Sequence, residues 1–144
     1  MYRQRRHPVE SPVESNPLKT DRSFALLSEP KIAKLGRRVY GFNLPAAISC
    51  PGATDVCLSC CFALAGHFRR PSVAAATARN LRRTKTTKFV PDMRNELSCT
   101  QPAVVRIHIG GDFYDAAYTR KWSAIIRSRG QTQFFAYTRS WRVP

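Results

Sequence analysis

The chain has 144 residues, 43% of them hydrophobic, which is typical of one globular domain and unlike a chain disordered throughout. No apolar run approaches the roughly 20 residues that cross a bilayer, and no apolar segment follows the basic N-terminus as a secretory signal requires. We therefore predict a cytoplasmic protein without a membrane segment. The formal net charge of +15 favours polyanionic partners, nucleic acid among them. A basic surface with no specific partner, and an acidic partner protein, are the alternatives.

Residues 1–22 are predicted to form a flexible basic tail. They contain Arg3, Arg5 and Arg6, the tandem repeat Pro8-Val-Glu-Ser11 and Pro12-Val-Glu-Ser15, and few large apolar side chains. Residues 23–144 are predicted to form a single α/β domain whose folded part begins near Phe24.

Strands and helices are predicted to alternate along this domain. Strands are expected at Val39–Leu44, Ala103–Ile109 and Gln133–Thr138. Helices are expected at Cys57–Ala65, at Ser72–Lys85, at Asp92–Leu97, and where Tyr118, Trp122, Ile125 and Ile126 share one face. This order predicts parallel βα units that form a partial, half TIM-like barrel.

Three strands at most would leave a sheet with an exposed edge. We therefore expect either a partner subunit that covers this edge or a chain that is a truncated form of a longer domain. Alternation along Ala103–Ile109 is expected to place Ile107 and Ile109 on one face and Arg106 and His108 on the other.

Four of the five cysteines lie close together in the sequence, and these are Cys50, Cys57, Cys60 and Cys61. Spacings of three and four residues place pairs of thiols on one helical turn. In a reducing compartment, thiolates at this density favour zinc or an iron–sulfur cluster over disulfides. Adjacent Cys60 and Cys61 can hardly both bind one ion, and three ligands would leave an open coordination position. The alternatives are small buried apolar residues and a redox role.

A second motif, Gly110-Gly111-Asp112, follows the clearest strand. Ligands of parallel sheets bind at the carboxyl ends of the strands, where the cysteine loop and Thr138-Arg139-Ser140 are also expected. The two glycines would let a ligand approach the backbone, Asp112 would accept its hydrogen bonds, and His108 would lie behind them. Alternatively, Asp112 or Asp115 caps the next helix and His108 is a core residue.

Basic residues occur in blocks without acidic residues, and aromatic residues are interleaved with the last of them. This pattern is compatible with phosphate contacts and base stacking. The predicted nucleic-acid contacts are Arg79, Arg82, Arg83, Arg139 and Trp141. The alternative is that the arginines form a solvated face and the aromatic residues belong to the core.

Ordered motifs between Ile32 and Trp141 resemble the phage gene product eighty-eight family, which occurs in mycobacteriophages and other phages. They are Tyr40-Gly-Phe-Asn-Leu-Pro45, Cys50-Pro-Gly-Ala53, Cys57, Cys61-Phe-Ala-Leu64, Phe68-Arg69, Pro71-Ser-Val73, Arg79-Asn-Leu81, Val105-Arg-Ile-His-Ile-Gly-Gly-Asp-Phe-Tyr114, Lys121-Trp122 and Phe135-Ala-Tyr-Thr-Arg-Ser-Trp141. The resemblance implies that Cys50, Cys57 and Cys61 are the shared cysteines and that Cys60 is additional. It also implies a longer chain, but no biochemical function.

Three cysteines after a first strand, followed by a Gly-Gly-acid motif, distantly resemble the radical SAM enzymes. This resemblance implies a [4Fe–4S] cluster and S-adenosylmethionine as cofactors, although the spacing of the cysteines differs and Asp112 replaces the usual glutamate. The leading hypothesis is therefore a metal-binding or cluster-binding α/β protein. The second is a nucleic-acid-binding module with a structural zinc, and the third is a functionless remnant.

Overall fold

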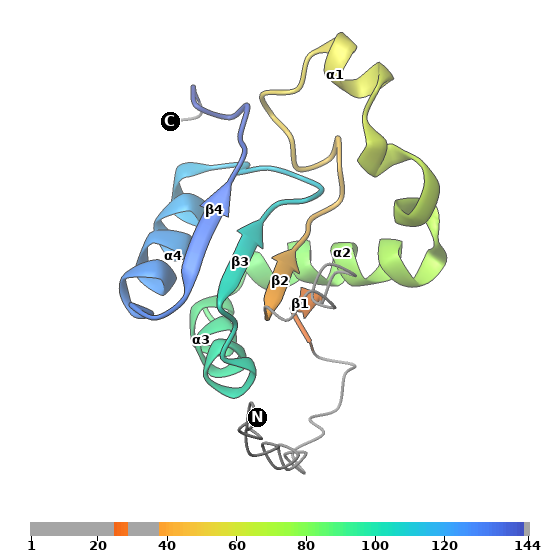
Figure 1. The fold of residues 1–144 in the computed structure, drawn as a ribbon. Coiled ribbons are helices and arrows are strands. Elements are labelled where there is room, and N and C mark those ends of the chain that lie inside the picture. Colours follow the sequence, from red (N-terminus) through yellow and green to blue (C-terminus); the bar gives the residue numbers. More distant parts are fainter. Residues whose placement is uncertain (1–24, 29–37, 143–144) are drawn as a thin grey trace, which may run out of the picture.

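The computed structural model describes residues 25–28 and 38–142 of the chain (Figure 1). The predicted tail, residues 1–22, and the predicted start near Phe24 lie outside the described residues. The strands are β1 (Leu27–Ser28), β2 (Val39–Phe42), β3 (Val104–Ile107) and β4 (Gln133–Ala136). The helices are α1 (Asp55–Ser59), α2 (Pro71–Thr84), α3 (Phe89–Thr100) and α4 (Ala116–Arg127), with two short 3-10 helices, η3 (Phe62–Leu64) and η4 (Gly66–Arg69).

The four strands form one mixed sheet in the order β1-β2-β3-β4 (Figure 1). Strands β2, β3 and β4 are parallel, with Val39 opposite Val104 and Val104 opposite Gln133. The α/β class and the three parallel strands are therefore confirmed. The prediction of three strands at most was wrong, because β1 pairs with β2 in the antiparallel direction.

Two side chains from the helices hold strand β1 and the residue before it in place. The carboxylate of Glu96 in α3 accepts hydrogen bonds from the backbone N–H groups of Leu26 and Leu27, each at 2.8 Å. In α2, the Asn80 amide donates to the carbonyl of Leu26 at 3.0 Å and to that of Asn43 at 3.1 Å. Burial raises the pKa of Glu96 above its usual value, and the two backbone hydrogen bonds oppose that effect.

The core lies on one face of the sheet. Phe42, Val105 and Ile107 from the strands are buried against side chains of α3 and α4, among them Phe89 and Trp122. The opposite face carries Arg106, Phe135 and Tyr137, the last two of which are exposed. In the described part of the chain, no helix is long and apolar enough to cross a membrane.

Three predicted helices differ from the observed ones. The helix expected at Cys57–Ala65 is the single-turn α1, because Thr54 caps it by accepting from the Cys57 N–H and the backbone leaves helical geometry at Cys60. The helix expected from Ser72 begins at Pro71, whose fixed φ suits a first helical position, and Ser72 is not its cap. Helix α3 is longer at both ends than the predicted Asp92–Leu97.

Candidate functional site

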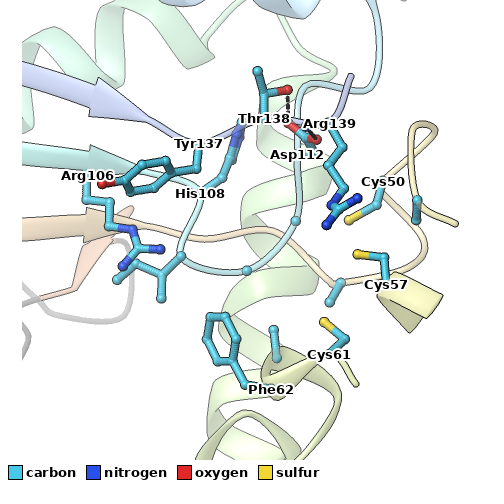
Figure 2. Close-up of a pocket in the computed structure, with 16 residues that line it drawn as sticks. Cys50, Cys57, Cys61, Phe62, Arg106, His108, Asp112, Tyr137, Thr138 and Arg139 are labelled. Atoms are coloured by element: carbon cyan, nitrogen blue, oxygen red, sulfur yellow. Dashed lines mark hydrogen bonds between the residues drawn. The ribbon is translucent and has the colours of Figure 1, made fainter. Parts of the chain in front are cut away.

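A cavity of about 440 Å³ lies at the carboxyl ends of the parallel strands. Its wall includes residues of the cysteine loop, the Gly110-Gly111-Asp112 turn after β3 and the segment that follows β4 (Figure 2). The size is that of a small-molecule site. The three motifs that the sequence predicted at this edge of the sheet therefore share one cavity.

Three of the four clustered cysteines line this cavity, namely Cys50, Cys57 and Cys61. Their sulfur atoms all lie on the side of the loop that faces Arg139 (Figure 2). Cys60 and Cys99 are exposed and lie outside the cavity wall, and all five thiols are free. Within residues 25–28 and 38–142, no group of three or more His, Cys, Asp and Glu side chains is placed so that it could hold a metal ion.

The Cys50 thiol is shifted toward its protonated form. Burial raises the pKa of Cys50, a backbone hydrogen bond at Ala47 lowers it, and the nearby Asp112, Cys61 and Cys57 raise it further. A bound cation would reverse this balance, because it favours thiolates.

The cysteine loop is held against the segment after β4 by a close backbone contact. A Cβ atom at Gly52 would lie 2.3 Å from the carbonyl oxygen of Arg139, so no larger residue fits without moving one of the two segments. The backbone N–H of Asp112 also donates to the carbonyl of Ser49 at 3.1 Å. These contacts fix the loop that carries Cys50 over the ends of β3 and β4.

The two glycines after β3 line the cavity and also pack tightly against neighbouring segments. Gly111 has a φ of +84°, and a Cβ atom there would lie 2.5 Å from the Leu44 Cβ and 2.7 Å from the Ser49 Oγ. The side-chain oxygen of Asn43 accepts from the N–H groups of Ile109 and Gly110, both at 3.1 Å. Asn43 therefore supports this turn, a role that the sequence did not signal, because Asn43 lies inside the predicted strand Val39–Leu44 and the observed strand ends at Phe42.

Asp112 joins the ends of two strands. Its Oδ1 accepts from the Phe113 N–H at 2.7 Å and from the Thr138 hydroxyl at 2.6 Å, and its Oδ2 accepts from the Arg139 N–H at 2.8 Å (Figure 2). Both oxygens are therefore engaged within the protein, whereas the sequence suggested an acceptor for a ligand. The cap of α4 is Asp115, which accepts from the Tyr118 N–H.

His108 lies on the core side, which corrects the predicted alternation. Its φ of +62° is left-handed, so the strand ends before it and its side chain turns toward α4. Nε2 is 2.8 Å from the Tyr118 hydroxyl, while Nδ1 is buried without a hydrogen-bond partner. Burial lowers the pKa of His108 to about 4, although Asp112 acts in the opposite direction, so the ring is neutral at pH 7.

The predicted nucleic-acid contacts do not form one surface. Arg79 donates to the carbonyl of Ala25, and Arg83 pairs with Asp92, whereas Arg82 is exposed. Arg139 and Trp141 lie on a different part of the molecule and line a second concavity beside Pro51 and Gly52. Arg139 also lines the cavity with the cysteines. The sequence predicted only that Arg139 lies at the end of a strand.

Comparison with known proteins identifies the family. A family model described as Gene product 88 matches residues 14–143. The chain belongs to the Gene product 88 family. The Gene 88 proteins of Mycobacterium phages L5 and D29 are 34% and 33% identical to it over 102 residues. These matches cover 63% of this chain but only 43% and 42% of the two phage proteins.

The chain thus spans less than half the length of the curated relatives it matches. No solved structure matches it. The family predicted from the ordered motifs is confirmed, while the likeness to radical SAM enzymes stays a prediction. Neither phage protein carries an activity in its name, so any function for this chain must be argued from its own cavity.

Proposed function

We propose that this protein binds a metal centre, an iron–sulfur cluster or zinc, through Cys50, Cys57 and Cys61. The observation that carries the proposal is that these three thiols line one cavity although they come from a loop, from α1 and from the residue before η3. Cys60, adjacent to Cys61, is exposed and outside the cavity wall. The five cysteines thus form two groups: a converging set, the three that line the cavity, and two others, Cys60 and Cys99, which are exposed. A site with three protein ligands requires such a set of three.

Metal binding in this proposal is coupled to a rearrangement of the loop. The thiols are not yet placed to hold an ion, but α1 has only five residues and none of them is buried. A short exposed helix can move at little cost in packing, and metal binding often supplies the folding energy of such segments. Arg139, which points toward the sulfur atoms, would balance the negative charge of the thiolates (Figure 2).

The adjacent cavity would hold the ligand. Three protein ligands leave one coordination position for a substrate or cofactor, and Gly110, Gly111, Asp112 and His108 line the same space. The likeness to radical SAM enzymes makes S-adenosylmethionine the first cofactor to test. The proposal extends to the half-barrel architecture, because β2, β3 and β4 are consecutive parallel strands with the site at their carboxyl ends.

The test is to purify the protein without oxygen and to measure iron, zinc and acid-labile sulfide per chain, together with visible absorption. We expect close to one metal centre per chain in the wild type and in Cys99→Ser, and little metal in Cys57→Ser. Iron with matching sulfide would assign a cluster, and zinc alone would assign a structural or hydrolytic site. Equal metal content in Cys57→Ser and Cys99→Ser would refute the proposal.

A second function, nucleic-acid binding with a structural zinc, is favoured by one observation. Trp141 is exposed, the Arg142 guanidinium lies 4.3 Å from its ring centroid, and both residues line the second concavity with Arg139. An exposed aromatic ring beside arginines suits base stacking. Binding to single-stranded DNA should then fall steeply with salt and weaken in Trp141→Ala. Unchanged affinity in Trp141→Ala would exclude this surface.

A further inference from the structure

The cavity beside the cysteines is lined by more positive than negative charge. Two arginines line it, Arg106 and Arg139, and its carboxylate, Asp112, already accepts three hydrogen bonds. The ion pair between Arg83 and Asp92 is the sole one found in the described part of the chain, and it lies on the helices. Neither cavity arginine therefore has a carboxylate partner there.

The two arginines differ in what they face. Arg139 points toward the three sulfur atoms, whereas Arg106 lies at the other end of the cavity beside Tyr137 (Figure 2). Arg139 is thus placed to balance thiolates, and Arg106 is left for a different anion. The Tyr137 ring, 5.5 Å from the Arg106 guanidinium carbon, holds the cation in place without neutralising it.

Arg106 also has an unsatisfied donor. Its Nε is buried and makes no hydrogen bond. A buried donor without a partner is costly, and the guanidinium fork of Nε and a terminal nitrogen matches the two oxygens of a carboxylate or phosphate. An oxyanion bound here would satisfy both the charge and the donor.

His108 also lines this cavity, but its ring is turned to the core side of the sheet. The His108 ring is only 3% exposed, and its Nδ1 has no hydrogen-bond partner. The left-handed backbone at His108 and the contact of Nε2 with Tyr118 hold the ring in this position. A non-glycine residue with positive φ is uncommon, and such strain persists where the surroundings fix it. The unpaired Nδ1 of His108 therefore lies on the core side, whereas Arg106 lies on the opposite face of the sheet.

We propose that the cavity binds a small organic anion whose carboxylate or phosphate group lies against the guanidinium of Arg106. The rest of the ligand extends toward the cysteines along the walls formed by Ile109 and Ala63. This inference rests on the proposed function for taking this cavity as the functional site. It does not require the metal.

The experiment measures the binding of two probes, inorganic phosphate and succinate, by calorimetry at constant ionic strength. The wild type should bind at least one of them saturably, and the preferred probe identifies a phosphate or a carboxylate ligand. Arg106→Gln should weaken binding at least tenfold. The control, Arg120→Gln, removes the same charge from an exposed position on α4 outside the cavity and should leave affinity within twofold.

A third variant, Arg106→Lys, keeps the charge but loses the planar fork. It should weaken binding severalfold, and it serves as the test if Arg106→Gln does not fold. The inference is overturned if neither probe binds saturably, or if the Arg106 and Arg120 variants weaken binding equally, since either result would mean general attraction to a basic surface.

Repeating the titration on protein stripped of metal separates the two proposals. Arg106→Gln should retain the metal content of the wild type, because Arg106 lies away from the thiols. Probe binding by a protein that carries no metal when purified without oxygen would refute the metal centre and leave the anion site standing. A protein that contains metal but binds neither probe would refute the anion site and leave the metal centre standing.

Discussion

The helix-covered face of the sheet and the rim that carries the cysteines are held together by different forces. On the covered face, Trp122 packs edge to face with Phe42 and Phe89, and these two rings are tilted against each other, with all ring centroids 5.2–5.6 Å apart. On the rim, apolar side chains of the cysteine segment point outward, with Ile48 79% and Val56 74% exposed. The contacts that fix the rim are instead polar or backbone contacts, at Asp112 and at Gly52.

This difference indicates a division of tasks between the two regions. The covered face holds a cluster of buried apolar side chains from the strands and helices, and their burial stabilises the sheet. The rim presents free thiols, unpaired arginines and exposed apolar side chains, the features expected of a surface that meets a ligand or a partner. Changes to the first region should therefore unfold the protein, and changes to the second should alter binding first.

The largest expected effect comes from the core. Trp122 is 1% exposed and Trp141 is 70% exposed, and these are the two tryptophans of the chain. Trp122→Ala should lower the free energy of unfolding by about 3–5 kcal/mol, because it leaves a cavity among aromatic rings. Trp141→Ala should change it by less than about 0.5 kcal/mol. Urea denaturation followed by circular dichroism measures both, and equal losses would mean that the rim is part of the core.

The next largest effect is a loss of stability in acid, caused by a residue that lies where the two regions meet. His108 has a pKa of about 4 in the folded state against 6.5 for an ordinary histidine. The unfolded chain therefore takes up the proton first, so stability is greatest above pH 6.5 and is lost as the pH falls toward 4. The shift corresponds to about 3 kcal/mol, at about 1.4 kcal/mol per pKa unit.

His108→Asn should remove this component, since asparagine tolerates the left-handed backbone and does not titrate. The free energy of unfolding, measured from pH 7 to pH 4, should fall less steeply with acid in the variant than in the wild type. Identical slopes would show that His108 is not the group that titrates.

The sequence predicts the helix-covered face better than the rim, because different interactions stabilise the two regions. The alternation of Val105 and Ile107, and the spacing of Tyr118 and Trp122, predict β3 and α4 because apolar periodicity is what the core requires. Strand β1 has two residues and depends on Asn80 and Glu96 from distant helices, so no local pattern reveals it.

At the rim, sequence order predicts that the cysteines, the Gly-Gly-Asp turn and the end of β4 meet, because all follow parallel strands. It does not predict the role of each residue. The face of the sheet to which His108 turns depends on one left-handed φ. The carboxylate of Asp112 accepts a hydrogen bond from Thr138, which lies 26 positions later in the chain. The partner subunit predicted for the sheet edge, where β4 is the outer described strand, stays a prediction.

A smaller effect is expected from the rim's own polar contacts. Asp112→Asn keeps one oxygen but places an NH₂ group against one of three donors, so we expect a loss of about 1–3 kcal/mol. Asp115→Asn is the matched control, because asparagine caps a helix about as well as aspartate. Thermal unfolding should separate the two variants, and comparable melting temperatures would mean that Asp112 does not join the strand ends.

The smallest expected effect distinguishes neighbouring cysteines on the rim. Cys60 is exposed, and its thiol contacts only the carbonyl of Val56, 3.0 Å away, whereas Cys61 lines the cavity. Cys60→Ser should therefore leave both the free energy of unfolding, within about 0.5 kcal/mol, and the metal content of the protein unchanged. Cys61→Ser should lose metal with an equally small change in the stability of the metal-free chain. Because the two residues are adjacent, a difference between them must come from the direction of the thiol rather than from its place in the sequence.

Loss of metal in both variants would mean that the loop turns Cys60 inward when the metal binds. The division of the cysteines into a converging set and two others would then be wrong.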